Sequence, residues 1–278
     1  MGQQRSGRRN FKHGQKMRKI TITLFLSAFA FISNAQLSKD IFPLNREFKK
    51  GGFYIAPQAT VSIGNKEENT YQNQDSTYNY EVTGRGKWGY GLEIGWFHSF
   101  KKARLIHFLD AGIAYRVFKG AAEHSGELTS LSGQQLFESE NEFSNQYLVA
   151  SLRATNATQL GKWTFLSTSL GLNYNYLLAD DYERGSDYPK SDETFLNDQS
   201  LQLHLQVGIG MRLSRQLVGI PYVETPLLTA LPTDDLNPAF PFFSARYQPI
   251  IIGIKLLFLR EDPMNCNAPV FDGPQPGM

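Results

Sequence analysis

The chain has 278 residues, with 28 Lys and Arg against 26 Asp and Glu, and a formal net charge of +2 at pH 7. This near-neutral balance excludes the overall basic footprint of nucleic-acid-binding proteins. The single cysteine, Cys266, excludes a disulfide framework within the chain, and it is expected to be an unpaired thiol.

The first predicted element is an export signal. Basic residues precede the apolar run 20–31, and the small residues Ser33 and Ala35 follow it. This order predicts a secretory signal peptide over residues 1–35, cleaved before Gln36, with either Met1 or Met17 as its start. A signal anchor is the alternative, but the run is short for a membrane-spanning helix. No later run approaches 18 apolar residues, so an exported chain of this kind enters a membrane only as a closed barrel.

Eight segments after the signal have strand character, and most alternate apolar with polar or glycine residues. The alternation predicts residues with odd numbers, such as Ile113, Tyr115 and Val117, on the outer face of segment 104–118. The prolines Pro221 and Pro226 predict bulges or bends in segment 217–229, because proline cannot donate to a ladder. The eight segments are residues 53–63, 87–100, 104–118, 142–154, 162–178, 201–213, 217–229 and 244–259.

The clearest of these segments is Leu201–Leu213. One face is entirely aliphatic, and the other carries Gln202, His204, Gln206, two glycines and Arg212. Strands of soluble proteins usually run about 5–6 residues, whereas thirteen alternating residues suit a tilted strand crossing a bilayer. The sequence therefore predicts an all-β fold, an eight-stranded antiparallel transmembrane up-and-down β-barrel with lipid outside and a polar interior.

The connections between the segments alternate in length, as in outer-membrane barrels. Short turns are predicted at 101–103, 155–161 and 214–216, and they carry Lys101, Lys102 and Arg215 but no acid. An even strand number puts both termini on the side of these turns, the periplasm. The net charge of the long connections, counted from Lys and Arg against Asp and Glu, is −12 in total. Such acidic loops could bind divalent cations that bridge to lipopolysaccharide. The alternative is that these loops are polar only because they are solvated. The long connections are predicted at 64–86, 119–141, 179–199 and 230–243.

The interior of an eight-stranded barrel is just wide enough for side chains to fill it. Its charges persist only when paired, so the inward polar residues are expected to form a packed structural network. An ion or proton path is the alternative. The residues of the predicted network are Glu93, Asp110, Arg116, His204, Gln206, Arg212, Glu224 and Lys255.

Catalytic and metal-binding patterns are weak. The consecutive residues Glu123, His124 and Ser125 hold the residue types of a hydrolase triad, but a flexible loop would not fix their geometry. The histidines His98, His107, His124 and His204 lie far apart in the sequence, so no metal spacing and no cofactor are predicted.

Four features resemble the outer-membrane β-barrel family common in Bacteroidetes, often labelled PorT-like. The likeness covers most of the chain after the signal, and some relatives take part in type IX secretion and gliding. Thr225 departs from the family pattern, and twenty residues follow Phe258, where barrel assembly signals usually end the chain. The four features are Ser33-Asn34-Ala35 before Gln36, Gly89–Gly95, Tyr222–Leu228 and Ile251–Phe258.

The sequence thus predicts a non-enzymatic outer-membrane protein with a structural or surface-interaction role. An accessory of a protein-export complex and a lipid-modifying enzyme are the alternatives. Expected partners are outer-membrane lipid, lipopolysaccharide, the barrel assembly machinery and possible periplasmic or secretion proteins. The expected parts are a signal (1–35), a periplasmic leader (36–51), the barrel (52–260) and a disordered periplasmic tail (261–278).

Overall fold

The structure is a computed structural model. Its second compact unit, Asp40–Met278, holds all the described residues, and the first, Met1–Lys39, holds none of them. The expected signal peptide, most of the leader and all but the first residue of the expected tail lie outside the described residues. No helix in the described part of the chain is long and apolar enough to cross a membrane. The described residues are 48–64, 66–73, 76–100, 105–130, 133–161, 163–183, 198–214, 216–231 and 247–261.

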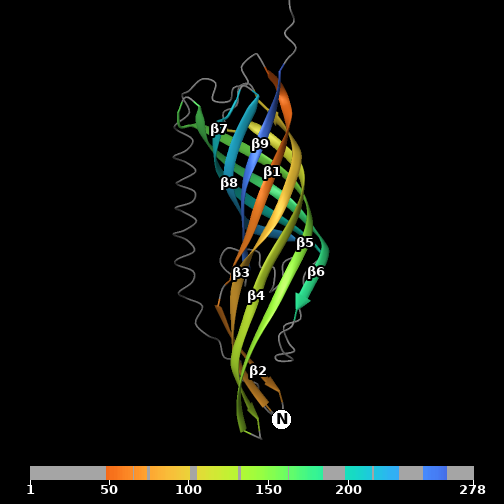
Figure 1. The fold of residues 1–278 in the computed structure, drawn as a ribbon, viewed down its shortest axis with the longest axis vertical. Helices are drawn as coiled ribbons and strands as arrows, with labels where there is room; N and C mark the ends of the chain where they lie inside the picture. The colour runs from red at the N-terminus through yellow and green to blue at the C-terminus, as the bar shows by residue number, and fades with distance from the viewer. Residues whose placement is uncertain are drawn as a thin grey trace, which may run out of the picture. The chain divides into compact units, whose positions relative to one another are not determined.

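Nine antiparallel strands within these ranges form one sheet. Each strand after β1 pairs with the next in sequence, β9 returns to pair with β1, and β1 also pairs with β3, which closes a ring (Figure 1). The ring has eight strands, and the prediction of an eight-stranded antiparallel up-and-down barrel is confirmed. The strands are β1 (Phe48–Gly64), β2 (Lys66–Asn73), β3 (Ser76–Ser99), β4 (Phe108–Ser130), β5 (Gly133–Gln159), β6 (Thr164–Glu183), β7 (Gln199–Arg212), β8 (Leu217–Leu231) and β9 (Tyr247–Glu261).

Strand β2 is the one strand of the nine that is not part of the ring, because it continues β1. Val61 of β1 pairs with Trp88 of β3, and five residues further along both strands Lys66 of β2 pairs with Thr83. The register against β3 is therefore unbroken. Close approach at this junction needs glycine, because a Cβ on Gly64 would lie 2.1 Å from the carbonyl oxygen of Gly84.

The two ends of the ring differ. Phe48 pairs with Glu261, so the first and last described strands meet at the end that also holds the turns at 160–163 and 213–216. We call this the short-turn end. Following paired residues once around the ring from Phe108 returns to β4 between Arg116 and Lys119, eight to eleven residues from the start. Such a stagger requires strands that tilt strongly against the barrel axis.

The outer face of the ring is apolar, because the alternation of the sequence places every second residue there. Leu92, Ile94 and Ile113 are 51%, 56% and 58% exposed, and similar side chains continue on neighbouring strands. Val117 departs from its predicted outward position and is buried. The pairing of β3 with β4 shifts register between Lys87 and Gly91, and the pairing of β5 with β6 shifts between Gln146 and Tyr147. The regular alternation is therefore interrupted near Val117.

Two of the predicted long connections are wrong. Most of residues 64–86 and 119–141 form β2 and the continuations of β3, β4 and β5 (Figure 1). The pairing runs to the ends of these strands, since Asn73 pairs with Ser76 and Ser130 with Gly133. Beyond Tyr247 of β9 and Glu183 of β6, and within the part of the chain that the structure describes, these strands pair only with one another. We call this part the extension: Lys66–Asn73, Ser76–Gly86, Gly120–Ser130 and Gly133–Asn141.

The predicted irregularity in β8 occurs at one of its two prolines. Pro226 pairs with His204, and the register against β7 shifts between this pair and the next one. A second shift in the same pairing lies just before Leu231. Pro221 instead keeps a regular position opposite Ile254 of β9. The parts of the other long connections at 184–197 and 232–246 lie outside the described residues.

Candidate functional site: a buried charge network

The ring encloses seven of the eight predicted network residues. None of the seven is more than 4% exposed, and each comes from an inward position of its strand. Arg212 is the exception. It is half-buried at the short-turn end, where its Nε donates to the Ser214 carbonyl and its Cζ lies 5.5 Å from the Trp163 ring centroid. The seven are Glu93, Asp110, Arg116, His204, Gln206, Glu224 and Lys255.

Glu93 of β3 accepts the most hydrogen bonds in the network. Its carboxylate receives both terminal nitrogens of Arg153, with Nη1 2.5 Å from Oε1 and Nη2 2.9 Å from Oε2. Tyr54 Oη donates to Oε1 at 2.6 Å, Gln58 Nε2 to Oε2 at 2.8 Å, and Ser151 Oγ to Oε1 at 3.1 Å. A buried carboxylate is stable in this setting because several donors replace its lost water.

Asp110 links two further strands to the same centre. Its Oδ1 accepts from Arg153 Nη1 and from Lys255 Nζ, both at 3.1 Å. The Lys255 ammonium also lies 4.8 Å from the centroid of the Tyr54 ring, within cation–π range. One carboxylate therefore ties β4 to β5 and to β9.

Glu224 forms the third anionic position, on β8. Asn173 Nδ2 donates to its Oε1 at 2.8 Å, and Arg116 Nη2 lies 3.4 Å from the same oxygen. Arg153 Nη2 lies 3.4 Å from Oε2, and His204 Nδ1 lies 3.0 Å from Oε1. The two arginines thus connect Glu224 with Glu93 across the interior.

Neutral side chains complete the cross-links. Gln58 donates from Nε2 to Tyr222 Oη at 2.9 Å and accepts from Arg116 Nε at 2.9 Å. All eight ring strands supply a member of the network. The charges of the buried set in the described part of the chain balance, with Glu93, Asp110 and Glu224 against Arg116, Arg153 and Lys255. Such balance suits a group of charges removed from water.

Glycines at inward positions provide the space for these large side chains. A Cβ on Gly112 would lie 2.2 Å from Tyr54 Oη, and one on Gly171 would lie 2.4 Å from Arg153 Cγ. A Cβ on Gly253 would lie 2.7 Å from Tyr222 Oη. The glycine spacing of these strands therefore belongs to the packing of the network.

The sequence prediction missed several members of the network. The most important is Arg153, together with Tyr54, Gln58 and Tyr222. The signal for Arg153 was present in the sequence, because strict alternation through Leu148, Ala150 and Leu152 puts residue 153 on the opposite face of segment 142–154. Leu152 is 55% exposed and Arg153 is 1% exposed.

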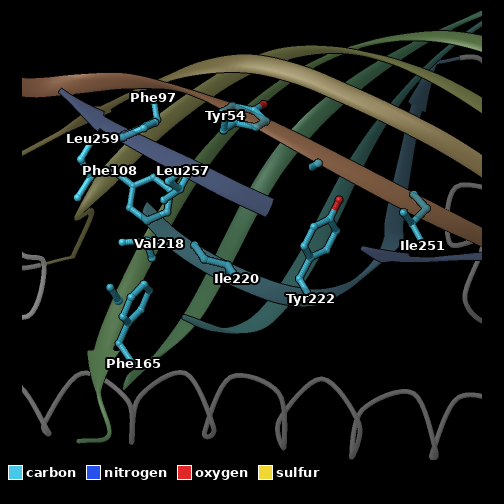
Figure 2. Packing of buried hydrophobic residues seen from close by; sticks show 12 residues of the cluster. Tyr54, Phe97, Phe108, Phe165, Val218, Ile220, Tyr222, Ile251, Leu257 and Leu259 are labelled. Carbon is cyan, nitrogen blue, oxygen red and sulfur yellow. The ribbon is translucent and has the colours of Figure 1, made fainter. Parts of the chain in front are cut away.

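The prediction of a polar interior is wrong at the short-turn end. There aromatic and aliphatic inward residues pack into a buried cluster (Figure 2). Phe97 and Phe108 meet edge to face with ring centroids 6.4 Å apart. We call this group the apolar plug: Phe97, Phe108, Ala157, Phe165, Val218, Ile220, Leu257 and Leu259.

The residues Glu123, His124 and Ser125 lie on strand β4 in the extension, not on a flexible loop. Successive side chains of a strand point to opposite faces, so His124 cannot share a face with its two neighbours. His124 is buried, whereas Glu123 is partly exposed and pairs with Arg85 at 2.6 Å. The three residues do not form a triad.

The pairing and the interior together define the class: an eight-stranded antiparallel up-and-down β-barrel with charged and apolar side chains buried inside it. No protein-family model matches the chain, and no curated protein matches it. The resemblance to the PorT-like family therefore stays a prediction.

Solved structures similar to this chain include three outer-membrane barrels. The outer membrane protein OprG from Pseudomonas aeruginosa has a TM-score of 0.33 at 10% identity, covering 77% of this chain and 95% of that one. The translocator domain of autotransporter NalP from Neisseria meningitidis has 0.28 at 9%, covering 77% and 90%. The transport unit of autotransporter AIDA-I from Escherichia coli has 0.23 at 9%, covering 82% and 97%. With TM-scores below 0.5 these likenesses carry no weight for function, and the fold assignment rests on strand pairing.

Proposed function

We propose that the protein is a non-enzymatic outer-membrane β-barrel with a closed interior, which holds the extension at the cell surface. The observation that carries this proposal is the contrast between the two faces of the ring. Aliphatic and aromatic side chains stand exposed outside, while charges are buried and paired inside. A water-soluble barrel would bury its apolar face, whereas a barrel in lipid exposes it.

The filled interior supports a structural role over a channel role. The network joins opposite sides of the ring, for example β4 to β8 through Arg116 and Glu224 and β4 to β9 through Asp110 and Lys255. The apolar plug adds a second layer at the short-turn end. Eight strands leave little space beyond that of their own side chains.

The proposal includes an orientation and a processing scheme. Residues 1–35 are removed as a signal, residues 36–51 and 261–278 are periplasmic, and the short-turn end faces the periplasm. The extension then lies outside the cell, in reach of lipopolysaccharide. The barrel assembly machinery inserts the chain during biogenesis.

Vesicle reconstitution tests this proposal. The purified chain from Gln36 is folded into phospholipid vesicles and treated with protease from outside. We expect a compact, heat-modifiable band on gel electrophoresis, protection of the ring, and quenching of Trp88 and Trp96 by brominated lipid. A protein that stays soluble, or whose tryptophans are not quenched, would contradict the proposal.

A further inference from the structure

We propose that the edge of β5 in the extension, residues 133–140, binds an extended basic segment of another protein by strand addition. The inference deepens the surface role proposed above and rests on it. The edge follows from the pairing of β5. Its Gly133–Glu140 stretch pairs with β4 on one side, while β6 reaches β5 only as far as the pair Glu142 and Glu183.

Within the described residues, this stretch of β5 has a partner on one side only. A strand with one neighbour presents a row of free N–H and C=O groups on its other side, which can pair with an incoming strand. The rest of the extension supports the edge, since β4, β3 and β2 follow in order behind it. The edge is therefore held in extended form before any partner arrives.

The side chains next to this edge are acidic. Glu138 and Glu140 are exposed, and neither has an ion-pair partner among the described residues. Glu140 also stands directly opposite Glu123 of β4. Glu123 is paired with Arg85 at 2.6 Å, so the acids that a basic side chain on an added strand would pair with are Glu138 and Glu140. By contrast, Glu142 is already paired, with Lys87 at 2.6 Å.

Charge also argues against a second copy of this chain and against its two segments that lie between β6 and β7 and between β8 and β9. Two copies joined through β5 would bring Glu138 and Glu140 close to the same residues of the other copy. The chain's own segments 184–197 and 232–246 each have one more acidic than basic residue, and both contain proline. A foreign strand with Lys or Arg at alternate positions complements the edge best, because successive residues on one face lie next to Glu138 and Glu140.

A peptide pair of equal charge tests the proposal. The probe is a nine-residue peptide of alternating Lys and Thr in all-L form, and the control has the same sequence with alternating D and L residues, which cannot form a regular strand. The protein is the full barrel in vesicles. We expect the all-L peptide to bind at least tenfold more tightly and to slow amide hydrogen exchange over residues 134–140. Equal binding of the two peptides, or unchanged exchange at this edge, would overturn the proposal.

A matched pair of variants locates the site. Glu138→Gln with Glu140→Gln is expected to weaken binding of the all-L peptide about tenfold. Asp180→Asn with Asp181→Asn on β6 removes the same charge and is expected to change it less than twofold. Equal effects of the two double variants would refute the assignment to β5. Heat-modifiable mobility is measured on each sample, so failure to insert counts against the proposed function and not against the edge.

Discussion

Arg153 of β5 and Glu93 of β3 are joined by two nearly parallel hydrogen bonds, although sixty residues separate them in sequence. The paired nitrogens also reach Asp110 and Glu224. This arginine therefore contacts all three buried carboxylates of the network. A planar guanidinium suits this position because its fork matches carboxylate geometry in two directions at once.

Replacing this arginine should destabilise the barrel. Arg153→Met leaves Glu93 and Asp110 short of cationic donors inside the ring, and we expect a loss of about 3–5 kcal/mol in the free energy of unfolding. Urea unfolding in vesicles, followed by tryptophan fluorescence, measures it. Arg212→Met is the matched control, with an expected loss below about 1 kcal/mol because Arg212 lies outside the network. Equal losses for the two variants would contradict the central place of Arg153.

The glycine at position 112 should not tolerate a methyl group. Gly112→Ala places a Cβ 2.2 Å from Tyr54 Oη, and we expect a loss of about 1–3 kcal/mol. In a Tyr54→Phe background the same change should cost less, because the clashing oxygen is gone. Gly219→Ala is the control: the Cβ there would meet the flexible end of Leu213 at 2.9 Å. A loss at Gly112 that is the same in both backgrounds would show that Tyr54 is not the obstacle.

The outer face should reject charge only within the lipid. Ile113 is 58% exposed in the middle of the apolar face, and Ile113→Lys is expected to cost about 2–4 kcal/mol in vesicles. Ser125→Lys introduces the same charge at an exposed position of the extension and should cost little. Comparable losses of unfolding free energy at the two positions would contradict the assignment of Ile113 to the lipid and of Ser125 to the water.

The extension contains an acid whose ionisation should contribute to its stability. The hydrogen bond from Lys66 holds the pKa of Glu81 below its usual value of 4.5, and the two atoms lie 2.7 Å apart. A lowered pKa stabilises the folded state above pH 4.5, and this contribution is lost as the pH falls below it. NMR titration of the Glu81 carboxyl should show the low pKa, and Lys66→Met should return it toward 4.5. An unchanged pKa in that variant would exclude Lys66 as the cause.

The alternation of side chains made the ring predictable. Leu201–Leu213 and the glycine-rich Lys87–Phe100 show outward and inward faces that the strand geometry reproduces, including buried Glu93 and His204. Partners within the network were not predictable, because Arg153 meets Glu93 through pairing between distant strands. Arg212 was assigned to the network by alternation alone, but it lies at the short-turn end of β7, where the side chain reaches Ser214 and Trp163.

The extension escaped prediction for a different reason. Polar residues such as Asn79, Ser125 and Glu138 are exposed there, at positions where a membrane strand would carry Leu or Ile. Exposed ion pairs such as Arg85 with Glu123 give each strand little stability of its own. Pairing along neighbouring strands supports it instead, and single-sequence periodicity does not show such pairing.

Single-channel recording in planar bilayers tests the closed interior most directly. The wild-type barrel, with insertion confirmed by its heat-modifiable band, should show no large, steady conductance at neutral pH, because the charge network and the apolar plug fill the ring. A large and steady conductance from the inserted wild-type protein would contradict the account.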